Sequence, residues 1–349
     1  MAKIDELLKE LCPDGVEWKE LVDVVKTISP PIKLKVDSYL RSGLFPIIDQ
    51  SKDQIAGYTD DISNTLPYGQ YILYGDHTLA VKYYEGRFAQ GADGLKILLS
   101  KSSLPKYIYY CICAYNIQNN EYKRHWTQAK QIKLPLPPLP IQQHIVEVLD
   151  TFTDAISNLE EELALREKQF EYYREQLLSS DKHFEFKELK AVAKIKNGKD
   201  YKHLSCGNIP VFGSGGVMCY VDQYVYDKPT VLIPRKGSLG NLFYVDVPFW
   251  NVDTIFYTEI NTDLIKPKYL YYYLTIQRLD KLNGAGGVPS LTQTILNRIP
   301  ILLPSLNRQQ EIVEILDTFE AMIANIKEEI ALRTKQYEYY REKLLSFGK

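Results

Sequence analysis

The chain has 349 residues, of which 45% are hydrophobic and 12% aromatic, and its formal net charge is −2 at pH 7. This length is enough to bury at least two ordinary hydrophobic cores. No apolar run reaches the roughly 18 residues that a membrane-spanning helix needs, and the opening MAKIDELLKELC lacks the apolar stretch of a signal peptide, so we expect a soluble, cytoplasmic protein. The cysteines are odd in number and form no CxxC pair, which argues against a disulfide framework and predicts no metal site; they are Cys12, Cys111, Cys113, Cys206 and Cys219.

A short helix is expected over residues 4–11. The sequence DELL at 5–8 precedes Trp18 much as EQLL at 175–178 precedes Phe186, so the start of the chain resembles a helix end that leads into a module. We therefore expect this segment to dock near the end of the last long helix of the chain. A merely amphipathic helix with no such partner is the alternative, because short apolar periodicity is common.

Two globular modules are predicted, module 1 over residues 1–140 and module 2 over residues 181–308. Their sequences have diverged but share a skeleton. VEWKELVDVVKTI at 16–28 parallels FEFKELKAVAKIKNG at 184–198, FPIIDQS at 45 parallels IPVFGSG at 209, and IKLPLPPL at 132 parallels IPILLPSL at 299. Repeats of this length are whole domains, which excludes solenoids and propellers. We predict two α/β (α+β) modules.

Tyrosine clusters occur at corresponding places in the two modules. YIYYCICA at 107 parallels YLYYYLTI at 269, and each cluster precedes a proline-rich segment. Stacking of these rings on bases is possible in principle. Because the clusters align between the halves, we interpret them as the core of a module helix.

A repeated helix follows each module. Residues 142–178 recur as 309–345, with 25 of 37 positions identical. Apolar residues alternate at spacings of four and three over more than four heptads, which is typical of a coiled-coil seam. The seam residues of the first copy are Ile145, Leu149, Phe152, Ile156, Leu159, Leu163, Arg166, Phe170, Tyr173 and Leu177. We predict spacer helices over 141–180 and 309–349, each about 55 Å long if continuous.

Antiparallel packing of the two helices is expected, because a whole module lies between them and this packing places one module at each end of a rod. Arg166 and Arg333 interrupt the two seams at the same place. Each arginine either pairs with a facing carboxylate and fixes the register, or reaches solvent from a widened seam.

Apolar residues off the seam leave more surface than a two-stranded coil covers. This predicts partner proteins against the rod, in two copies if a pseudo-twofold axis relates the helices. Cover by the modules themselves is the alternative. The candidate partner-binding residues are Gln143, Val146, Leu165 and Tyr172 in the first copy and Gln310, Val313, Leu332 and Tyr339 in the second.

Charge is distributed unevenly along the chain. Residues 141–180 carry nine acidic and three basic side chains, a net charge of −6, and residues 309–346 carry eight and five, a net charge of −3. The remainder of the chain therefore holds +7. Basic modules suit contact with phosphate while acidic helices face protein, although acidic helices that are simply solvated would show the same pattern.

Polar and basic residues in predicted loops are the candidates for DNA contact. Arginine and lysine suit guanine or phosphate, and glutamine or asparagine suits adenine. The candidates are Gln50, Ser51, Lys52, His77, Lys123, Arg124 and Lys130 in module 1, and Lys199, Lys202, Ser214, Arg235, Lys236, Asn241, Thr292 and Gln293 in module 2.

The whole chain resembles a known family. Duplicated helices that open with Gln-Gln-x-Ile-Val after LPLPPL or PILLPSL, together with CPDGVEWKEL and GAGGVPSLTQTIL, are similar to the specificity (S) subunits of Type I restriction-modification systems. The resemblance implies that each module is a target recognition domain that reads half of a split, asymmetric double-stranded DNA target. It also implies that the helices bind two methyltransferase (M) subunits, to which restriction (R) subunits are added.

Catalysis is expected to lie outside this chain. The sequence has no GxxxxGK[ST] for ATP, no strand-linked GxGxxG, and no Asn-Pro-Pro-aromatic run of the kind that adenine methyltransferases use. The glycine-rich segments at 213–216 and 284–287 lack such spacings and are read as loops. We predict no catalytic residue and no cofactor in this chain, with S-adenosylmethionine, ATP and Mg²⁺ on partner subunits. The alternative function is a coiled-coil scaffold whose two divergent modules bind proteins.

Overall fold

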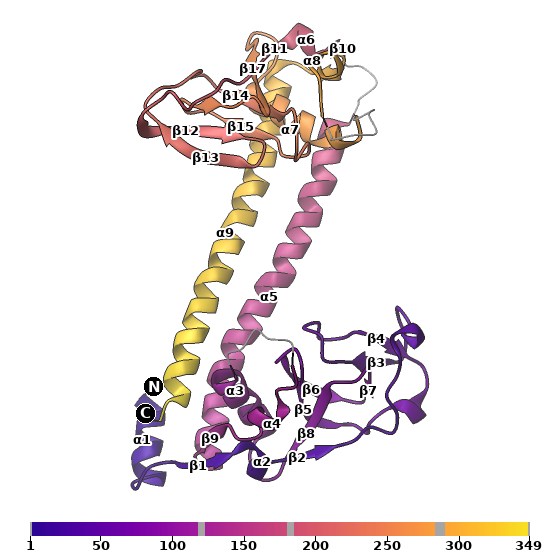
Figure 1. Ribbon diagram of the computed structural model, residues 1–349, viewed down its shortest axis with the longest axis vertical. Coiled ribbons are helices and arrows are strands. Elements are labelled where there is room, and N and C mark those ends of the chain that lie inside the picture. Colours follow the sequence, from indigo (N-terminus) through magenta and orange to yellow (C-terminus); the bar gives the residue numbers. More distant parts are fainter. Residues whose placement is uncertain (1, 118–122, 180–184, 283–289, 348–349) are drawn as a thin grey trace. The chain divides into compact units, whose positions relative to one another are not determined.

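The computed structural model describes residues 2–117, 123–179, 185–282 and 290–347. The chain divides into two compact units (Figure 1). Unit 1 comprises Met1–Glu160 with Glu329–Lys349, and unit 2 comprises Glu161–Glu328. Each unit therefore groups one module with the adjoining parts of both long helices. The division into two modules and two spacer helices, with the boundaries given above, remains a prediction from the sequence.

Module 1 contains three small sheets. Strands β1 (Glu17–Glu20) and β9 (Lys133–Leu136) form an antiparallel pair. A four-stranded sheet has the order β2-β8-β5-β6, with β2 at Val25–Ile28, β8 at Leu95–Ser100, β5 at Gly69–Gly75 and β6 at Val81–Gly86. A three-stranded sheet has the order β4-β3-β7, with β4 at Gly57–Thr59, β3 at Phe45–Ile48 and β7 at Ala89–Gln90. The module also contains helices α2 (Leu21–Val24), α3 (Pro105–Tyr115) and α4 (Trp126–Ala129), besides α1 (Ala2–Leu11) and, among the described residues, two short 3-10 helices.

Module 2 repeats this topology. Strand β10 (Glu185–Glu188) pairs with β18 (Pro300–Leu303). The four-stranded sheet is β11-β17-β14-β15, with β11 at Ala193–Lys196, β17 at Ile255–Ile260, β14 at Thr230–Pro234 and β15 at Phe243–Val245. The three-stranded sheet is β13-β12-β16, with β13 at Gly216–Val221, β12 at Cys206–Gly213 and β16 at Trp250–Asn251. The helices are α6 (Leu189–Val192), α7 (Pro267–Ile276) and α8 (Gln293–Leu296). The matching strand order confirms the predicted α/β modules and the duplication.

The tyrosine clusters lie in module helices α3 and α7, as the sequence predicts. Tyr107 and Tyr269 are fully buried. Their hydroxyls donate to the backbone oxygens of Pro135 and Leu302, at 2.9 and 3.2 Å. Each ring thus fills the module core while its polar end bonds the strand that leads into the long helix. The prediction of a core role for these clusters is confirmed.

The long helices are α5 (Leu139–Leu178) and α9 (Leu306–Leu345), each of 40 residues. Ser305 accepts the backbone N–H of Arg308 at 3.2 Å and so caps the start of α9. In unit 1, Phe152 of α5 stacks on Tyr340 of α9 with ring centroids 5.2 Å apart. In unit 2, the corresponding pair Tyr173 and Phe319 stacks at 5.4 Å. The N-terminal part of α5 therefore packs against the C-terminal part of α9 in unit 1, and the C-terminal part of α5 packs against the N-terminal part of α9 in unit 2. This confirms antiparallel packing.

In each unit, three corresponding side chains connect the module helix, α3 or α7, to the long helix. Tyr110 donates its hydroxyl proton to Asp150 at 2.6 Å, and Lys106 lies 2.8 Å from the same carboxylate. In unit 2, Tyr272 bonds Asp317 at 2.6 Å and Lys268 lies 2.9 Å from it. Burial, together with the neighbouring carboxylate, raises the pKa of both tyrosines, so each hydroxyl keeps its proton and remains the donor.

The seam arginines bond carboxylates on their own helices. Arg166 lies 3.4 Å from Glu162 and Arg333 lies 2.7 Å from Glu329, in each case one helical turn away. The arginine side chains are 39% and 43% exposed. These contacts agree with arginines that reach solvent from a widened seam rather than with pairing to a facing carboxylate.

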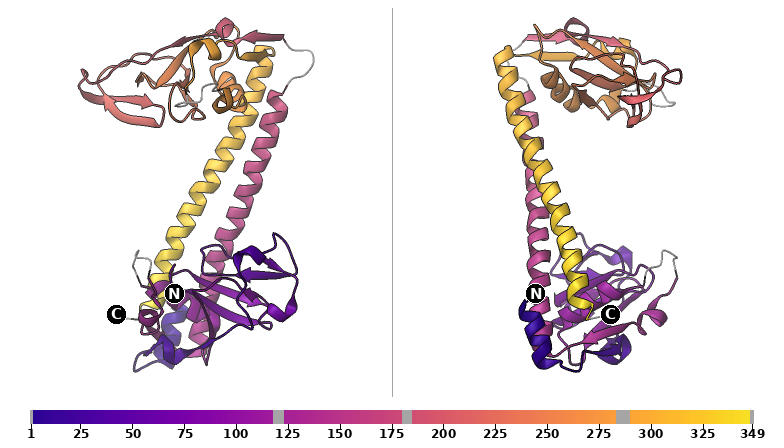
Figure 2. Two further views of the ribbon diagram at one scale, coloured as in Figure 1. Left: turned by 45° about the vertical axis from the view of Figure 1, so that its right-hand side comes forward. Right: turned by 90° about the vertical axis from the view of Figure 1, so that its left-hand side faces the viewer.

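The N-terminal helix α1 (Ala2–Leu11) docks where the sequence predicts. Ile4 is 3% exposed and belongs to the same apolar cluster as Leu344 and Leu345 of α9. Figures 1 and 2 show α1 beside the end of α9 in unit 1. The start of the chain thus covers apolar surface that the last turn of α9 would otherwise expose.

Replacing Ile4 by Asp should lower the free energy of unfolding of unit 1 by about 3 kcal/mol, because the carboxylate would be buried among leucines. Urea unfolding measures this value. Lys3→Asp, at an exposed position of the same helix, is the control and should change stability by less than about 0.5 kcal/mol. Equal losses in the two variants would show that α1 does not depend on this contact.

Two negative findings apply to the described residues only. None of their helices is both long and apolar enough to cross a membrane. Among the same residues, no group of three or more His, Cys, Asp or Glu side chains is placed to hold a metal ion. The glycine-rich segment at 284–287 lies outside the described residues. The other segment forms the turn between β12 and β13, where Gly216 has a φ of 110° that side-chain-bearing residues rarely adopt.

Candidate nucleic-acid interface

Four loops of module 1 meet beside its two larger sheets, and Gln50 connects three of them. Its side-chain Nε2 donates to the backbone oxygen of Asp93 at 3.0 Å, and its Oε1 accepts the backbone N–H of His77 at 3.2 Å. The hydroxyl of Thr78 donates to the backbone oxygen of Gln50. The fourth loop joins through Asp76, whose carboxylate accepts the backbone N–H of His125 at 2.9 Å.

Charged side chains of both signs occupy this group of loops. Lys33 lies 2.6 Å from Asp93, and its charge and hydrogen bond lower the pKa of that carboxyl. Lys96 lies 3.6 Å from the buried Asp76. Lys52, Lys123 and Arg124 are exposed on the same loops. Exposed cations on loops whose carboxylates are already engaged within the module fit a surface that contacts phosphate.

Six of the seven module 1 candidates lie on these four loops. They are Gln50, Ser51, Lys52, His77, Lys123 and Arg124. Because both polar atoms of the Gln50 amide bond backbone groups of neighbouring loops, this side chain connects loops in the structure. Lys130 follows α4, away from this group, and its backbone oxygen bonds the N–H of Val22 at 3.0 Å.

In module 2, the candidate DNA-contact residues also lie on neighbouring loops. The side-chain amide of Asn241 donates to the backbone oxygen of Ser214 at 3.4 Å. Lys236 pairs with Ser290 as an isolated β-bridge, and the N–H of Leu291 bonds the oxygen of Arg235 at 2.9 Å. The β12–β13 turn, the loop after β14 and the segment before α8 are therefore adjacent.

The remaining candidates of module 2 lie on these segments or next to them. Thr292 caps α8 by accepting the N–H of Ile295, and the amide of Gln293 donates to Asn197 at 3.2 Å. The N–H of Lys199 bonds the oxygen of Asn251 at 2.8 Å. Lys202 is exposed on the turn that follows. The described contacts thus place these loops in sequence along one part of module 2.

The two modules differ in charge at an equivalent position. Asp76 follows β5, and its N–H bonds the oxygen of Gly94 at 2.6 Å; Arg235 follows β14, and its N–H bonds the oxygen of Thr254 at 2.9 Å. Asp76 is 4% exposed and accepts the N–H groups that start α4, whereas Arg235 lies over the ring of Phe256 at 5.9 Å. Equivalent backbone positions thus carry a buried acid that holds α4 in module 1 and a half-buried base in module 2.

The candidate partner-binding residues on the helices divide by exposure. Leu165, Tyr172, Leu332 and Tyr339 are 64, 60, 49 and 57% exposed. Gln143 is exposed and Gln310 half-buried. Val313 is only 7% exposed and packs in the apolar core of unit 2, so its own module covers it and it is removed from the predicted surface. Val146 is half-buried against the core of unit 1 for the same reason.

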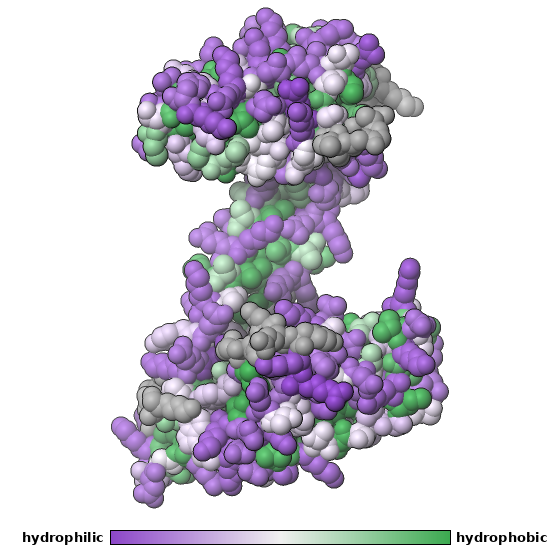
Figure 3. Space-filling view, viewed as in Figure 1, coloured by the Kyte–Doolittle hydropathy of each residue, from purple (hydrophilic) through white to green (hydrophobic). Residues whose placement is uncertain are grey.

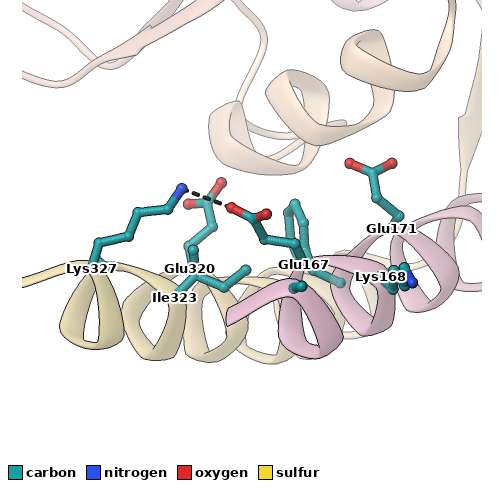
Figure 4. A pocket seen from close by; sticks show the side chains of 9 residues that line it. Glu167, Lys168, Glu171, Glu320, Ile323 and Lys327 are labelled. Carbon is teal, nitrogen blue, oxygen red and sulfur yellow. Dashed lines mark ion pairs between the residues drawn. The ribbon is translucent and has the colours of Figure 1, made fainter. Parts of the chain in front are cut away.

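A groove of about 790 Å³ lies between α5 and α9 within unit 2. Phe170 and Ile323 line its apolar part, and Lys327 pairs with Glu167 across the two helices at 2.8 Å (Figure 4). Figure 3 shows hydrophobic side chains at the surface of the long helices between polar ones. Apolar side chains within a charged rim suit the binding of another protein.

The sequence analysis missed Lys82, which holds one loop of the candidate interface. Lys82 of β6 is 4% exposed, and its ammonium donates to the backbone oxygens of Asp49, at 2.9 Å, and Asp53. Burial lowers the pKa of this amine, and the carboxylates of Asp49 and Asp53 oppose that effect. The signal was a lysine between Val81 and two tyrosines of a strand, where alternation places it on the face opposite to Tyr83.

The family described as "Type I restriction modification DNA specificity domain" matches the chain twice, over residues 13–166 and 181–332. Among curated relatives, the specificity subunit of the Type I restriction enzyme EcoR124I/EcoR124II of Escherichia coli is 29% identical over 414 aligned residues, which cover 100% of this chain and 98% of the relative. The specificity subunit of the Type I restriction enzyme EcoprrI, also of Escherichia coli, is 29% identical over 209 residues, 56% of this chain and 52% of the relative.

Solved structures agree on the fold. The S subunit of a Type I restriction-modification system from M. genitalium has a TM-score of 0.69 at 18% identity, over 95% of this chain and 96% of that chain. A chain from a structural study of complex assembly in the type I R-M system has a TM-score of 0.54 at 15% identity, over 95% and 98%. Because the family matches cover both modules and parts of both long helices, this chain belongs to the family of Type I restriction-modification DNA specificity proteins.

Proposed function

We propose that this chain is the DNA-specificity subunit of a Type I restriction-modification complex and that each module reads one half of a split, asymmetric target. One observation carries the proposal: the modules share a fold and strand order, yet the loop that holds the exposed Lys52 in module 1, residues 49–56, is only the two-residue turn 214–215 in module 2. Equal scaffolds with different hydrogen-bonding groups suit the reading of two different base sequences.

The long helices are proposed to bind partner subunits. Exposed Leu165 and Tyr172 recur as Leu332 and Tyr339, which suits two copies of one methyltransferase subunit, with restriction subunits added in the full complex. The chain itself supplies no active site. S-adenosylmethionine, ATP and Mg²⁺ are proposed to bind the partner subunits, and the complex is proposed to work in the cytoplasm, where it meets the chromosome.

Exchange of residues 181–308 for the equivalent module of a relative tests this function. The chain, assembled with its methyltransferase subunits, should methylate a target in which one half-sequence changes and the other is kept, because each module reads its own half. The measurement is a map of methylated bases for the parent and the exchanged complex.

A change in both halves of the target would contradict modular reading. Exchange of exposed helix residues such as Leu332 serves as the control, since it should weaken assembly without altering the methylated sequence. An assembled complex that binds partner proteins but shows no sequence-specific DNA binding would favour the protein-scaffold alternative.

A further inference from the structure

The loop between β3 and β4 of module 1 spans residues 49–56, whereas the matching hairpin of module 2 turns within residues 214–215. A long polar loop has many conformations available, so ordering it costs conformational entropy. In this module the loop is held at several points. One of them is a buried cation, Lys82.

Lys82 reaches the loop because of strand alternation. The ring of the neighbouring Tyr83 faces α3: its centroid lies 6.1 Å from the ring centroid of Tyr109 and 5.5 Å from the ammonium of Lys106. Successive side chains of a strand point to opposite faces, so Lys82 points away from α3. Its ammonium there donates to two backbone oxygens of the loop, those of Asp49 and Asp53.

The corresponding position of module 2 holds an aromatic ring. Lys82 pairs with Leu73 in the β5–β6 register, and Phe243 pairs with Leu232 in the β14–β15 register. Phe243 packs on Phe212 with centroids 5.9 Å apart, behind the short turn. The buried amine is therefore a feature of module 1 that accompanies its long loop and not a general requirement of the fold.

The charge of Lys82 also matters for the chemistry of the loop. Asp49 and Asp53 place two carboxylates near a surface proposed to meet DNA, where they would repel phosphate. The ammonium beneath them offsets that repulsion and fixes the backbone that carries the exposed Lys52. We propose that Lys82 is a positioning residue for target reading: it sets the conformation of residues 49–56, and through them the base preference of module 1. This inference rests on the proposed function.

Lys82→Met tests the inference, because it keeps the aliphatic stem and removes the ammonium. The complex of the full chain with its methyltransferase subunits is titrated with duplexes that carry the mapped target or single-base changes in either half. We expect discrimination to fall roughly tenfold in the half-site of module 1 and to stay unchanged in the other. Lys52→Met should reduce the slope of log affinity against log salt, whereas Lys82→Met should change it less, since a buried lysine contacts no phosphate.

Lys101→Met is the matched control. The amine of Lys101 also donates to two backbone oxygens of module 1, those of Val22 at 3.1 Å and Asp23 at 2.9 Å, but it holds α2 rather than the loop. This variant should leave discrimination in both halves intact. If Lys82→Met fails to fold, Thr78→Val decides the matter, because it removes the hydroxyl that bonds Gln50 at the start of the same loop.

Equal loss in both half-sites, or full discrimination by a folded variant complex, would overturn the inference. The exchange of residues 181–308 separates this from failure of the proposed function. If that exchange changes one half-sequence while Lys82→Met and Thr78→Val change nothing, only the role of Lys82 is wrong. If the exchange itself leaves the target unchanged, the modular reading fails.

Discussion

Replacing Gln309 by Leu should lower the free energy of unfolding of unit 2 by about 4 kcal/mol. Gln309 is fully buried. Its Oε1 accepts the N–H of Lys266 at 2.8 Å, and its Nε2 donates to the oxygens of Leu264 at 3.1 Å and Pro304 at 2.9 Å. Leucine of similar size would leave these backbone groups buried without partners, and each such group costs about 1–3 kcal/mol. Chemical unfolding of the purified chain, followed by a probe in module 2, measures the loss.

The duplicated sequence offers matched controls for this experiment. Gln142 holds the same place in unit 1, where it accepts the N–H of Leu104 at 3.0 Å and donates to Pro137 at 2.8 Å, so Gln142→Leu should destabilise unit 1 instead. The adjacent Gln143 is exposed, so Gln143→Leu should change stability by less than about 0.5 kcal/mol and act, if at all, on partner assembly. A large stability loss from Gln143→Leu, or none from Gln309→Leu, would show that burial does not separate the roles of the two glutamines.

Lengthening both long helices should increase the number of base pairs that separate the two half-sequences of the DNA target. The ion pair between Glu167 and Lys327 identifies positions at the same level of α5 and α9 for matched insertions. Four residues inserted before Glu167 and four after Lys327 add about 6 Å of helix, close to two base pairs at roughly 3.4 Å each. The map of methylated bases should keep both half-sequences and show one or two more base pairs between them.

Folding must be measured alongside, because a four-residue insertion disturbs a heptad seam. A parallel insertion of seven residues in each helix keeps the seam and should add about three base pairs. A folded, active complex whose spacer stays unchanged in both variants would show that something other than these helices sets the distance.

Some features of this protein were determined by its sequence alone. The duplication followed from comparing the chain with itself, and the two long helices followed from apolar spacing that extends over more than four heptads. The core role of Tyr107 and Tyr269 followed from their alignment between modules. These features are encoded locally or by repetition, so no knowledge of distant contacts was needed to find them.

Other features were decided only by tertiary structure. Gln142 and Gln143 are neighbours of the same type, yet only Gln142 is buried, because the backbone of Leu104, 38 residues away, provides its partner. The periodicity of the helix predicts that Val313 is exposed, whereas in the structure it packs in the apolar core of unit 2. The role of Lys82 in holding the loop could not be predicted from the sequence, because its partners Asp49 and Asp53 lie 33 and 29 residues away, in the loop between β3 and β4. Burial and hydrogen bonding depend on which distant segments fold together, and periodicity carries no information about that pairing.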